Sequence, residues 1–471
     1  MHEGNYREQI GEKLTELTSN SLPESIISKY QGRGPRYTSY PTALQFHQQF
    51  SNDEFVQAVR TSPNENLSIY VHIPFCRSLC YYCGCNKIVT QNALKVSRYN
   101  EALREEVAHR SQLFQRHKVQ QLHFGGGTPN YLHVDELADL VNTIKQHFNM
   151  TADCEISIEL DPRLLDESYI DAVASMGFNR ISLGIQDTNP EVQVAINRVQ
   201  STEKIQKLLR HARKVGIASI NLDLIFGLPF QSAQNFRKTL QDVAEFDADR
   251  IALFNYAHMP EKFAAQRKIK SSWLPAADTK LELLQMAEKA LEEDGYLQIG
   301  MDHFARPDDT LIKARNSRQL GRNFQGYTAC KGLDLLGLGL TAISHINNVY
   351  SQNCKSLSDY EHAVDTCKHA VERGLWLSKE DQLRAHVISE LMCNMYVDKK
   401  AVEALFNIHF DQYFDRELST LASFEEDGLL HDQQDHIQVY EKAKILLRSV
   451  CKVFDQYLDV GQEQKVASRI I

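Results

Sequence analysis

The chain has 471 residues, of which 42% are hydrophobic and 24% charged, and its formal net charge is −9. This length exceeds one small core and suits one large domain with one or two smaller parts. The acidic balance argues against general nucleic-acid binding, which needs a basic face.

The amino-terminal part lacks the marks of a targeting segment. Residues 1–20 are polar and contain no apolar stretch of the kind that a secretory signal needs, and no apolar run approaches the ~20 residues that cross a bilayer. We therefore expect a cytoplasmic protein without a membrane span. Residues 1–60 are expected to form an amino-terminal extension, in which GRGPRYTSYPTA (32–43) is a shaped, substrate-covering loop.

From about residue 67, short β-branched runs alternate with amphipathic helical segments such as 97–114 and 134–148. Strands that alternate with helices predict βαβ units, right-handed crossovers and a parallel sheet. Six such units indicate an α/β fold with a six-stranded partial barrel rather than a closed eight-stranded one. The predicted strands lie at 67–75, 119–127, 155–160, 180–185, 219–228 and 250–258.

The unusual residues follow the ends of these strands. Cysteines follow the first strand, GGGTP (125–129) follows the second, Glu159 and Asp161 close the third, and Gln186 follows the fourth. The fifth and sixth strands end in GLP and NYAH. Because the carboxyl ends of barrel strands share one rim, where active sites form, we expect these residues to converge.

The rest of the chain completes the expected domain organisation. Residues 61–355 are assigned to the barrel and its extension, in which QGYTACKGLDLLGLGLTAIS (325–344) is expected to be a loop. Residues 356–471 are expected to form a mostly helical carboxy-terminal domain with a small hairpin at 427–439. Since this domain has few clustered Lys or Arg residues, we interpret it as a packing or substrate-covering domain rather than a DNA reader.

Four cysteines lie in CRSLCYYCGC (76–85), directly after the first strand. Soft thiolates at this density select zinc or an iron–sulfur cluster, and buried or merely reactive thiols are a third interpretation. A closed zinc site normally joins separated pairs of ligands, whereas four thiolates in one loop would cross-link little of the chain. The rim position therefore favours a [4Fe–4S] cluster on Cys76, Cys80 and Cys83, with one iron left open for S-adenosyl-L-methionine (SAM).

Further rim residues are candidates for binding SAM. Without side chains, the glycines of GGGTP let the backbone approach a ligand and offer its amide groups. Glu159, Gln186, Arg198 and Asp223 are polar residues that can hold hydroxyl, ammonium or carboxylate groups. Each of them alone is more often a structural polar group, so the prediction depends on their shared location.

These motifs together resemble the oxygen-independent coproporphyrinogen III oxidases, a family of radical SAM enzymes. The resemblance runs from about residue 30 to the carboxyl terminus, and it implies oxidative decarboxylation of two propionates of coproporphyrinogen III to vinyl groups. The product would be protoporphyrinogen IX, formed in haem biosynthesis. The motifs are GPRYTSYPTA, HIPFCRSLCYYCGCNKIVT, HFGGGTPNYL, EISIELDP, GIQD, DLIFGLP, FNYAHMP, FARPDD and the stretch from NFQGYT to DLLGLGLTAIS.

The resemblance also implies two SAM molecules in one site. The cluster-bound SAM would be contacted by Tyr70, Gly126, Glu159 and Ile343. The second would lie near Tyr82, Gly127, Thr128, Gln186, Arg198, Asp223 and Ala257. Position 82 is often phenylalanine in relatives, so the hydroxyl of Tyr82 departs from the family pattern.

The residue at position 85 distinguishes the oxidases from the related haem chaperones. The related haem chaperones share the first three cysteines but usually have an aromatic residue at this fourth position. A haem-binding chaperone is therefore the alternative function. The reductant and the acceptor of the final substrate electron are expected to be other molecules, and the chain is expected to be a monomer.

Overall fold

The computed structural model describes residues 22–458, so the predicted absence of a secretory signal concerns residues that lie outside this range. The chain divides into two compact units: residues 41–379, and residues 22–40 together with 380–458. The sequence analysis places its boundaries after residues 60 and 355, and its three-part division stays a prediction. Within the described range, none of the helices is long and apolar enough to cross a membrane.

The six predicted strands form the centre of the larger unit. Each strand pairs in parallel with the next one along the chain, which confirms the predicted run of βαβ units. Most residues of β1 are buried, whereas along most of β7 buried residues alternate with half-buried ones, so one face of β7 is more deeply covered than the other. The strands are β1 (Asn66–Ile73), β4 (Lys118–Gly126), β5 (Asn149–Leu160), β6 (Arg180–Gln186), β7 (Ser219–Phe226) and β8 (Arg250–Asn255).

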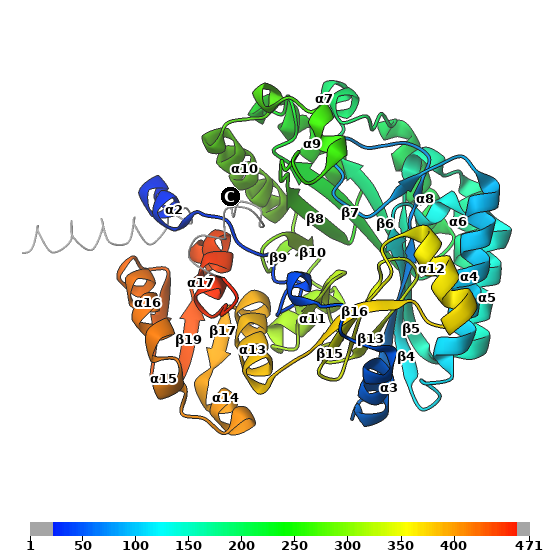
Figure 1. Ribbon diagram of the computed structural model, residues 1–471. Helices are drawn as coiled ribbons and strands as arrows, with labels where there is room; N and C mark the ends of the chain where they lie inside the picture. The colour runs from blue at the N-terminus through cyan, green and yellow to red at the C-terminus, as the bar shows by residue number, and fades with distance from the viewer. Residues whose placement is uncertain (1–21, 459–471) are drawn as a thin grey trace, which may run out of the picture. The chain divides into compact units, whose positions relative to one another are not determined.

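Helices follow these strands and lie along the outer side of the sheet (Figure 1). In α8 the buried residues Ile205, Leu208, Leu209 and Ala212 recur with helical spacing, so one face packs on the sheet. The side chain of Ser201 caps the first turn of α8 by accepting a hydrogen bond from the Lys204 amide. The helices are α4 (Ala93–Ser111), α5 (Val134–His147), α6 (Glu167–Ser175), α7 (Pro190–Ala195), α8 (Thr202–Lys214), α9 (Ala233–Glu245) and α10 (Ala277–Glu293).

Further strands extend the sheet at both edges. On one side β13 (Asp334–Leu338) pairs in parallel with β1 and is followed by antiparallel β14 (Ile343–Ile346), β15 (Val349–Asn353) and β16 (Val371–Trp376). On the other side β10 (His303–Ala305) and β9 (Leu297–Ile299) continue from β8. Further elements of this unit are α3 (Asn52–Thr61), α11 (Thr310–Asn316), β11 (Gly321–Asn323), β12 (Gly326–Thr328) and α12 (Leu357–Cys367).

The expectation of a loop at 325–344 is wrong for β12 and β13, which both lie within this stretch. All five residues of β13 are buried, and pairing with β1 satisfies their backbone groups. Gly337 allows the close approach of β14, because a Cβ atom there would lie 2.6 Å from the carbonyl oxygen of Ile343. Gly337 therefore serves the packing of two adjacent strands.

The smaller unit combines both ends of the described chain. The hairpin predicted at 427–439 is confirmed as the antiparallel pair β18 (Leu430–Asp432) and β19 (His436–Val439), with β17 (Tyr396–Asp398) on the other side of β19. The helices are α2 (Glu24–Tyr30), α13 (Lys379–Asn394), α14 (Lys399–Phe406), α15 (Phe410–Tyr413), α16 (Asp415–Glu426) and α17 (Leu447–Val453).

Candidate active site

The cysteine loop leaves the end of β1 and closes on itself. Short strands β2 (Phe75–Cys76) and β3 (Ile88–Val89) pair in parallel at its base. The Ile88 amide donates to the Pro74 carbonyl at 2.7 Å, and the Thr90 amide donates to the Cys76 carbonyl at 3.2 Å. All four clustered cysteines therefore lie on one closed loop.

Other rim segments hold the tip of this loop in place. The Tyr81 amide donates to the Ile196 carbonyl at 3.0 Å, and the Asn197 side-chain amide donates to the Leu79 carbonyl at 2.8 Å. The Gln266 side chain donates to the Tyr82 carbonyl at 2.9 Å. These bonds come from segments after β6 and β8, so the ends of distant strands determine the path of the loop.

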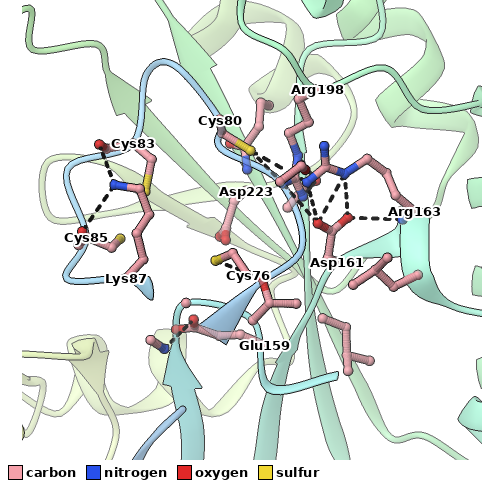
Figure 2. Close-up of a pocket in the computed structure, with 18 of the residues that line it drawn as sticks. Cys76, Cys80, Cys83, Cys85, Lys87, Glu159, Asp161, Arg163, Arg198 and Asp223 are labelled. Atoms are coloured by element: carbon pink, nitrogen blue, oxygen red, sulfur yellow. Dashed lines mark hydrogen bonds and ion pairs between the residues drawn. The ribbon is translucent and has the colours of Figure 1, made fainter. Parts of the chain in front are cut away.

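The loop borders a cavity of about 360 Å³ at the carboxyl ends of the strands (Figure 2). Most of the predicted site residues line this cavity, which agrees with the expected convergence at one rim. They are Cys76, Cys80, Cys83, Tyr82, Gly126, Gly127, Thr128, Glu159, Gln186, Arg198 and Asp223. Cys85 lines it as well.

Three predicted residues are not among those that line this cavity. Tyr70 stacks on His123 with ring centroids 5.9 Å apart, and its hydroxyl lies 3.0 Å from Nδ1 of His72. Ala257 follows the end of β8. Ile343 begins β14 and packs with a small apolar cluster. Their predicted contacts with SAM stay predictions.

Cys76 and Cys80, two of the predicted cluster ligands, have different hydrogen-bond donors. The Thr128 hydroxyl lies 3.4 Å from the Cys76 sulfur, and burial raises the pKa of Cys76 to about 11. Guanidinium groups of Arg163 and Arg198 each lie 3.6 Å from the Cys80 sulfur.

Cys83 and Cys85 form a pair of a different kind. A hydrogen bond from Cys85 lowers the pKa of Cys83 to about 6, and the same contact raises the pKa of Cys85 well above its usual value. The Lys87 ammonium donates to the carbonyls of both residues, at 3.2 Å for Cys83 and 3.4 Å for Cys85. This part of the loop thus favours a thiolate at Cys83 and a thiol at Cys85.

The glycine run has a role in packing as well as lining the cavity. A Cβ atom at Gly127 would lie 2.6 Å from the Pro74 carbonyl oxygen, and one at Gly126 would lie 2.6 Å from the His72 ring. Gly126 also has φ of +118°, a conformation that favours glycine. The run therefore allows β4 to approach the start of the cysteine loop.

The acidic residues of the cavity are held by neighbours on the inner face of the barrel. Glu159 accepts from the Gly126 amide at 3.3 Å and lies 3.3 Å from Nε2 of His123. Burial, followed by the nearby Glu159 carboxylate, raises the pKa of Asp223 to about 6. Gln186 has a positive φ of 65°, which is uncommon outside glycine and frequent at functional sites.

Several residues of the site were not predicted from the sequence. Arg163 and Lys87 reach the cysteine loop, and His123 supports Glu159. Asp161 was noted as the end of the third strand, but its contacts with two arginines were not foreseen. Their position in the sequence could have indicated a role in the site, because Asp161 and Arg163 follow the end of β5 at the predicted rim.

The residues present fit an iron–sulfur cluster. Three thiols of one loop line one cavity, and hydroxyl or guanidinium donors reach two of the sulfur atoms. Hydrogen bonds to sulfur stabilise thiolates that bind such clusters. Among residues 22–458, no three His, Cys, Asp or Glu side chains are placed to hold a single metal ion.

Comparison with known proteins agrees with this site. Residues 70–243 match the radical SAM superfamily, and residues 377–446 match the HemN C-terminal domain. The chain is therefore a radical SAM enzyme, and its cofactors are a [4Fe–4S] cluster and SAM.

Full-length relatives define the family more closely. The oxygen-independent coproporphyrinogen III oxidase of Escherichia coli is 47% identical, over 95% of this chain and 98% of its own. The enzyme of the same name from Synechocystis is 43% identical, over 95% and 97%. The chain belongs to the family of oxygen-independent coproporphyrinogen III oxidases.

A solved structure supports this conclusion. The coproporphyrinogen III oxidase (HemN) from Escherichia coli, described as a radical SAM enzyme, matches with a TM-score of 0.90 and 46% identity. The match covers 93% of this chain and all of that one. These relatives are oxidases by name, so they give the haem-chaperone alternative no support.

Proposed function

We propose that the enzyme converts two propionate side chains of coproporphyrinogen III to vinyl groups without dioxygen, giving protoporphyrinogen IX. Each propionate would lose one hydrogen atom from its β carbon, carbon dioxide and one electron. The observation that carries this proposal is the cavity with three cysteines at the barrel rim, in a chain 47% identical to a named oxidase of this kind.

When bound, the reduced cluster and SAM supply the 5′-deoxyadenosyl radical that removes the hydrogen atom. We assign Cys76, Cys80 and Cys83 as the cluster ligands, which leaves one iron for SAM. Their loop is closed at its base by Ile88 and Thr90, so the three sulfur atoms stay on the cavity. Enclosure by the rim would keep water away from the reacting atoms.

The contacts with SAM are part of the proposal. Glu159, held by His123 and the Gly126 amide, would accept hydrogen bonds from hydroxyl or ammonium groups. Arg198 is the cavity cation suited to a carboxylate. We assign the first SAM to Tyr70, Gly126, Glu159 and Ile343. We assign a second SAM to Tyr82, Gly127, Thr128, Gln186, Arg198, Asp223 and Ala257.

The partners and the location of the enzyme are also proposed. We expect a separate one-electron donor and a separate acceptor, since the proposed chemistry needs both. A cytoplasmic location is supported by Cys154 and Cys354, which are free thiols without a role in the proposed cluster, because thiols stay reduced in that compartment. The monomeric state stays a prediction, which sedimentation of the purified protein tests.

The decisive experiment is anaerobic turnover. The protein is reconstituted with iron and sulfide and supplied with SAM, a reductant and coproporphyrinogen III, and the products are followed by mass. We expect 5′-deoxyadenosine, carbon dioxide and protoporphyrinogen IX. Protein that holds about four irons but forms no vinyl product, even with added electron acceptors, would contradict the proposal. Stoichiometric haem binding without a vinyl product would favour the chaperone alternative.

A further inference from the structure

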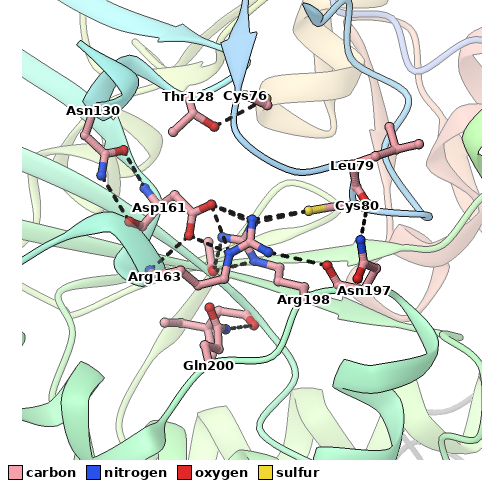
Figure 3. A network of polar contacts seen from close by, with 12 residues as sticks. Cys76, Leu79, Cys80, Thr128, Asn130, Asp161, Arg163, Asn197, Arg198 and Gln200 are labelled. Carbon is pink, nitrogen blue, oxygen red and sulfur yellow. Dashed lines mark hydrogen bonds and ion pairs between the residues drawn. The ribbon is translucent and has the colours of Figure 1, made fainter. Parts of the chain in front are cut away.

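The sulfur atom of Cys80 has an environment unlike that of the other predicted ligands. Nη2 of Arg163 and Nη1 of Arg198 each lie 3.6 Å from it (Figure 3). Cys76 has a hydroxyl donor from Thr128, and Cys83 has the Cys85 thiol. Hydrogen bonds from charged donors are roughly twice as strong as neutral ones, so Cys80 has the stronger donors.

Asp161 aligns the two guanidinium groups. Nε of Arg163 lies 3.0 Å from Oδ1 of Asp161, and Nη2 of Arg163 lies 2.6 Å from Oδ2. Nη1 of Arg198 lies 3.5 Å from the same Oδ2 atom. The side-chain amide of Asn130 holds the backbone of Asp161: its Oδ1 accepts from the Asp161 amide at 2.8 Å, and its Nδ2 donates to the Asp161 carbonyl at 3.0 Å. One buried carboxylate thus orients both donors toward one sulfur atom.

The backbone of β6 fixes the far side of Arg198. Nε and Nη2 of Arg198 donate to the Gly184 carbonyl at 3.2 and 2.7 Å. A Cβ atom at position 184 would lie 2.8 Å from Nη2 of Arg198, so glycine leaves room for the guanidinium. Side-chain exposure is 8% for Arg198 and 6% for Asp161, and both groups therefore act in a poorly solvated setting.

The charges of Arg163, Arg198 and Asp161 also influence the surroundings of the Cys80 sulfur. Although burial opposes it, the Arg198 pKa is raised by the neighbouring Tyr82, Asp161 and Cys80. The Asp161 pKa is lowered, because its two arginines outweigh burial. Two cations and one anion leave a net positive charge beside Cys80.

We propose that Arg163 and Arg198, aligned by Asp161, are positioning residues that donate N–H groups to the Cys80 thiolate and raise the reduction potential of the cluster. The inference rests on the proposed role of Cys80 as a cluster ligand. Reduction adds negative charge to the cluster and its sulfur ligands, so donors to sulfur favour the reduced form. The effect is to make the cluster easier to reduce by a given donor.

The test measures the reduction potential of the reconstituted cluster by redox titration followed by EPR. Arg163→Met removes one donor while Arg198 remains. We expect the reduction equilibrium constant to fall about tenfold, which is about 59 mV for a one-electron couple. Arg163→Lys keeps the charge but lacks the planar guanidinium group. Its reduction potential should lie between those of wild type and Arg163→Met.

Arg77→Met is the matched control. Arg77 is an exposed residue of the same loop, and its guanidinium lies over the Tyr131 ring at 5.7 Å rather than at a cysteine sulfur. The control loses the same charge, so it separates the hydrogen bond from the loss of charge. A potential for Arg163→Met equal to that of wild type, or equal to that of the control, would overturn the proposal.

A second measurement uses the unaltered enzyme and does not depend on the stability of a variant. The protein is labelled with ¹⁵N-arginine, and its reduced cluster is studied by pulsed EPR. Hyperfine coupling between the reduced cluster and arginine ¹⁵N supports the proposed hydrogen bonds to Cys80. The absence of this coupling would overturn the proposal. Cys80→Ser tests separately whether Cys80 is a cluster ligand. A Cys80→Ser variant that keeps its cluster would contradict this assignment, whatever the effect of the arginines.

Discussion

Cys85 is adjacent to a predicted cluster ligand in space as well as in sequence. Its thiol donates to Cys83, and its pKa is raised by that contact. A protonated cysteine is a donor rather than a metal ligand. The structure therefore supports a chemical difference between Cys85 and its three neighbours, which the sequence spacing alone does not show.

Cys85→Ser should keep the cluster, because a serine hydroxyl is also able to donate to Cys83. We expect about four irons per chain after reconstitution, and loss of the cluster in Cys76→Ser, Cys80→Ser and Cys83→Ser. Iron, sulfide and EPR measurements on the four variants provide the check. Iron loss in Cys85→Ser equal to that of the other three would contradict the three-ligand assignment.

His345 links the stability of the larger unit to pH. It stacks on Tyr350 with ring centroids 4.2 Å apart, and burial lowers its pKa from 6.5 to about 4. Between these pH values the unfolded chain binds a proton that the folded chain does not bind. The free energy of unfolding should therefore fall as the pH drops from about 6.5 to about 4, and this contribution should level off below that range.

His345→Gln should weaken this pH dependence. Its loss of stability between pH 7 and pH 4.5, measured by urea unfolding of the cluster-free protein, should be about 2 kcal/mol smaller than that of wild type. Part of the pH dependence should remain in the variant, because burial also lowers the pKa of His72 to about 4. His362→Gln, on an exposed position of α12, is the control, and an equal result for both variants would argue against the role of His345.

At the level of elements, an ion pair joins β8 to α11. Nε and Nη2 of Arg250 lie 2.7 Å from the two oxygens of Asp309, and the side chains are only 8% and 7% exposed. Asp309 also caps α11 by accepting from the Leu311 amide. The pair therefore connects the last parallel strand to the segment that follows the antiparallel edge.

Removing one partner of this pair leaves the other charge buried. We expect Arg250→Met to lower the free energy of unfolding of the larger unit by about 3–5 kcal/mol. The double variant Arg250→Met, Asp309→Leu should be less destabilised than the single variant, because it removes both charges. Denaturant unfolding of wild type, Arg250→Met, Asp309→Leu and the double variant measures the difference. If the double variant loses the sum of both single effects, the two side chains are not coupled.

At the scale of the whole chain, the segment 22–40 folds with residues 380–458. The Tyr37 hydroxyl donates to Asp455 at 3.0 Å, and Nε of Arg448 donates to the Pro35 carbonyl at 2.9 Å. Tyr30 packs on Phe424 with ring centroids 4.1 Å apart. The amino-terminal segment is therefore part of the core of the smaller unit.

Deleting residues 1–40 should destabilise the smaller unit, because the partners of Arg448, Phe424 and Asp455 are lost. We expect limited proteolysis to cleave within residues 380–458 at least tenfold faster than in the full chain, as a loss of about 1.4 kcal/mol or more would produce. Equal rates for the deletion variant and the full chain would contradict the assigned role of the segment 22–40.

The sequence predicted the parallel strands, the rim and the cysteine loop of this radical SAM enzyme. These features follow from local periodicity and from the spacing of thiols, which adjacent residues encode. It did not predict β13, because a glycine-rich apolar stretch becomes a strand only when β1 lies beside it. It also did not predict that Asp161, Arg163 and Arg198 meet at Cys80. Cys80 follows β1, Asp161 and Arg163 follow β5, and Arg198 follows β6. Only the folded sheet brings these side chains within hydrogen-bond distance.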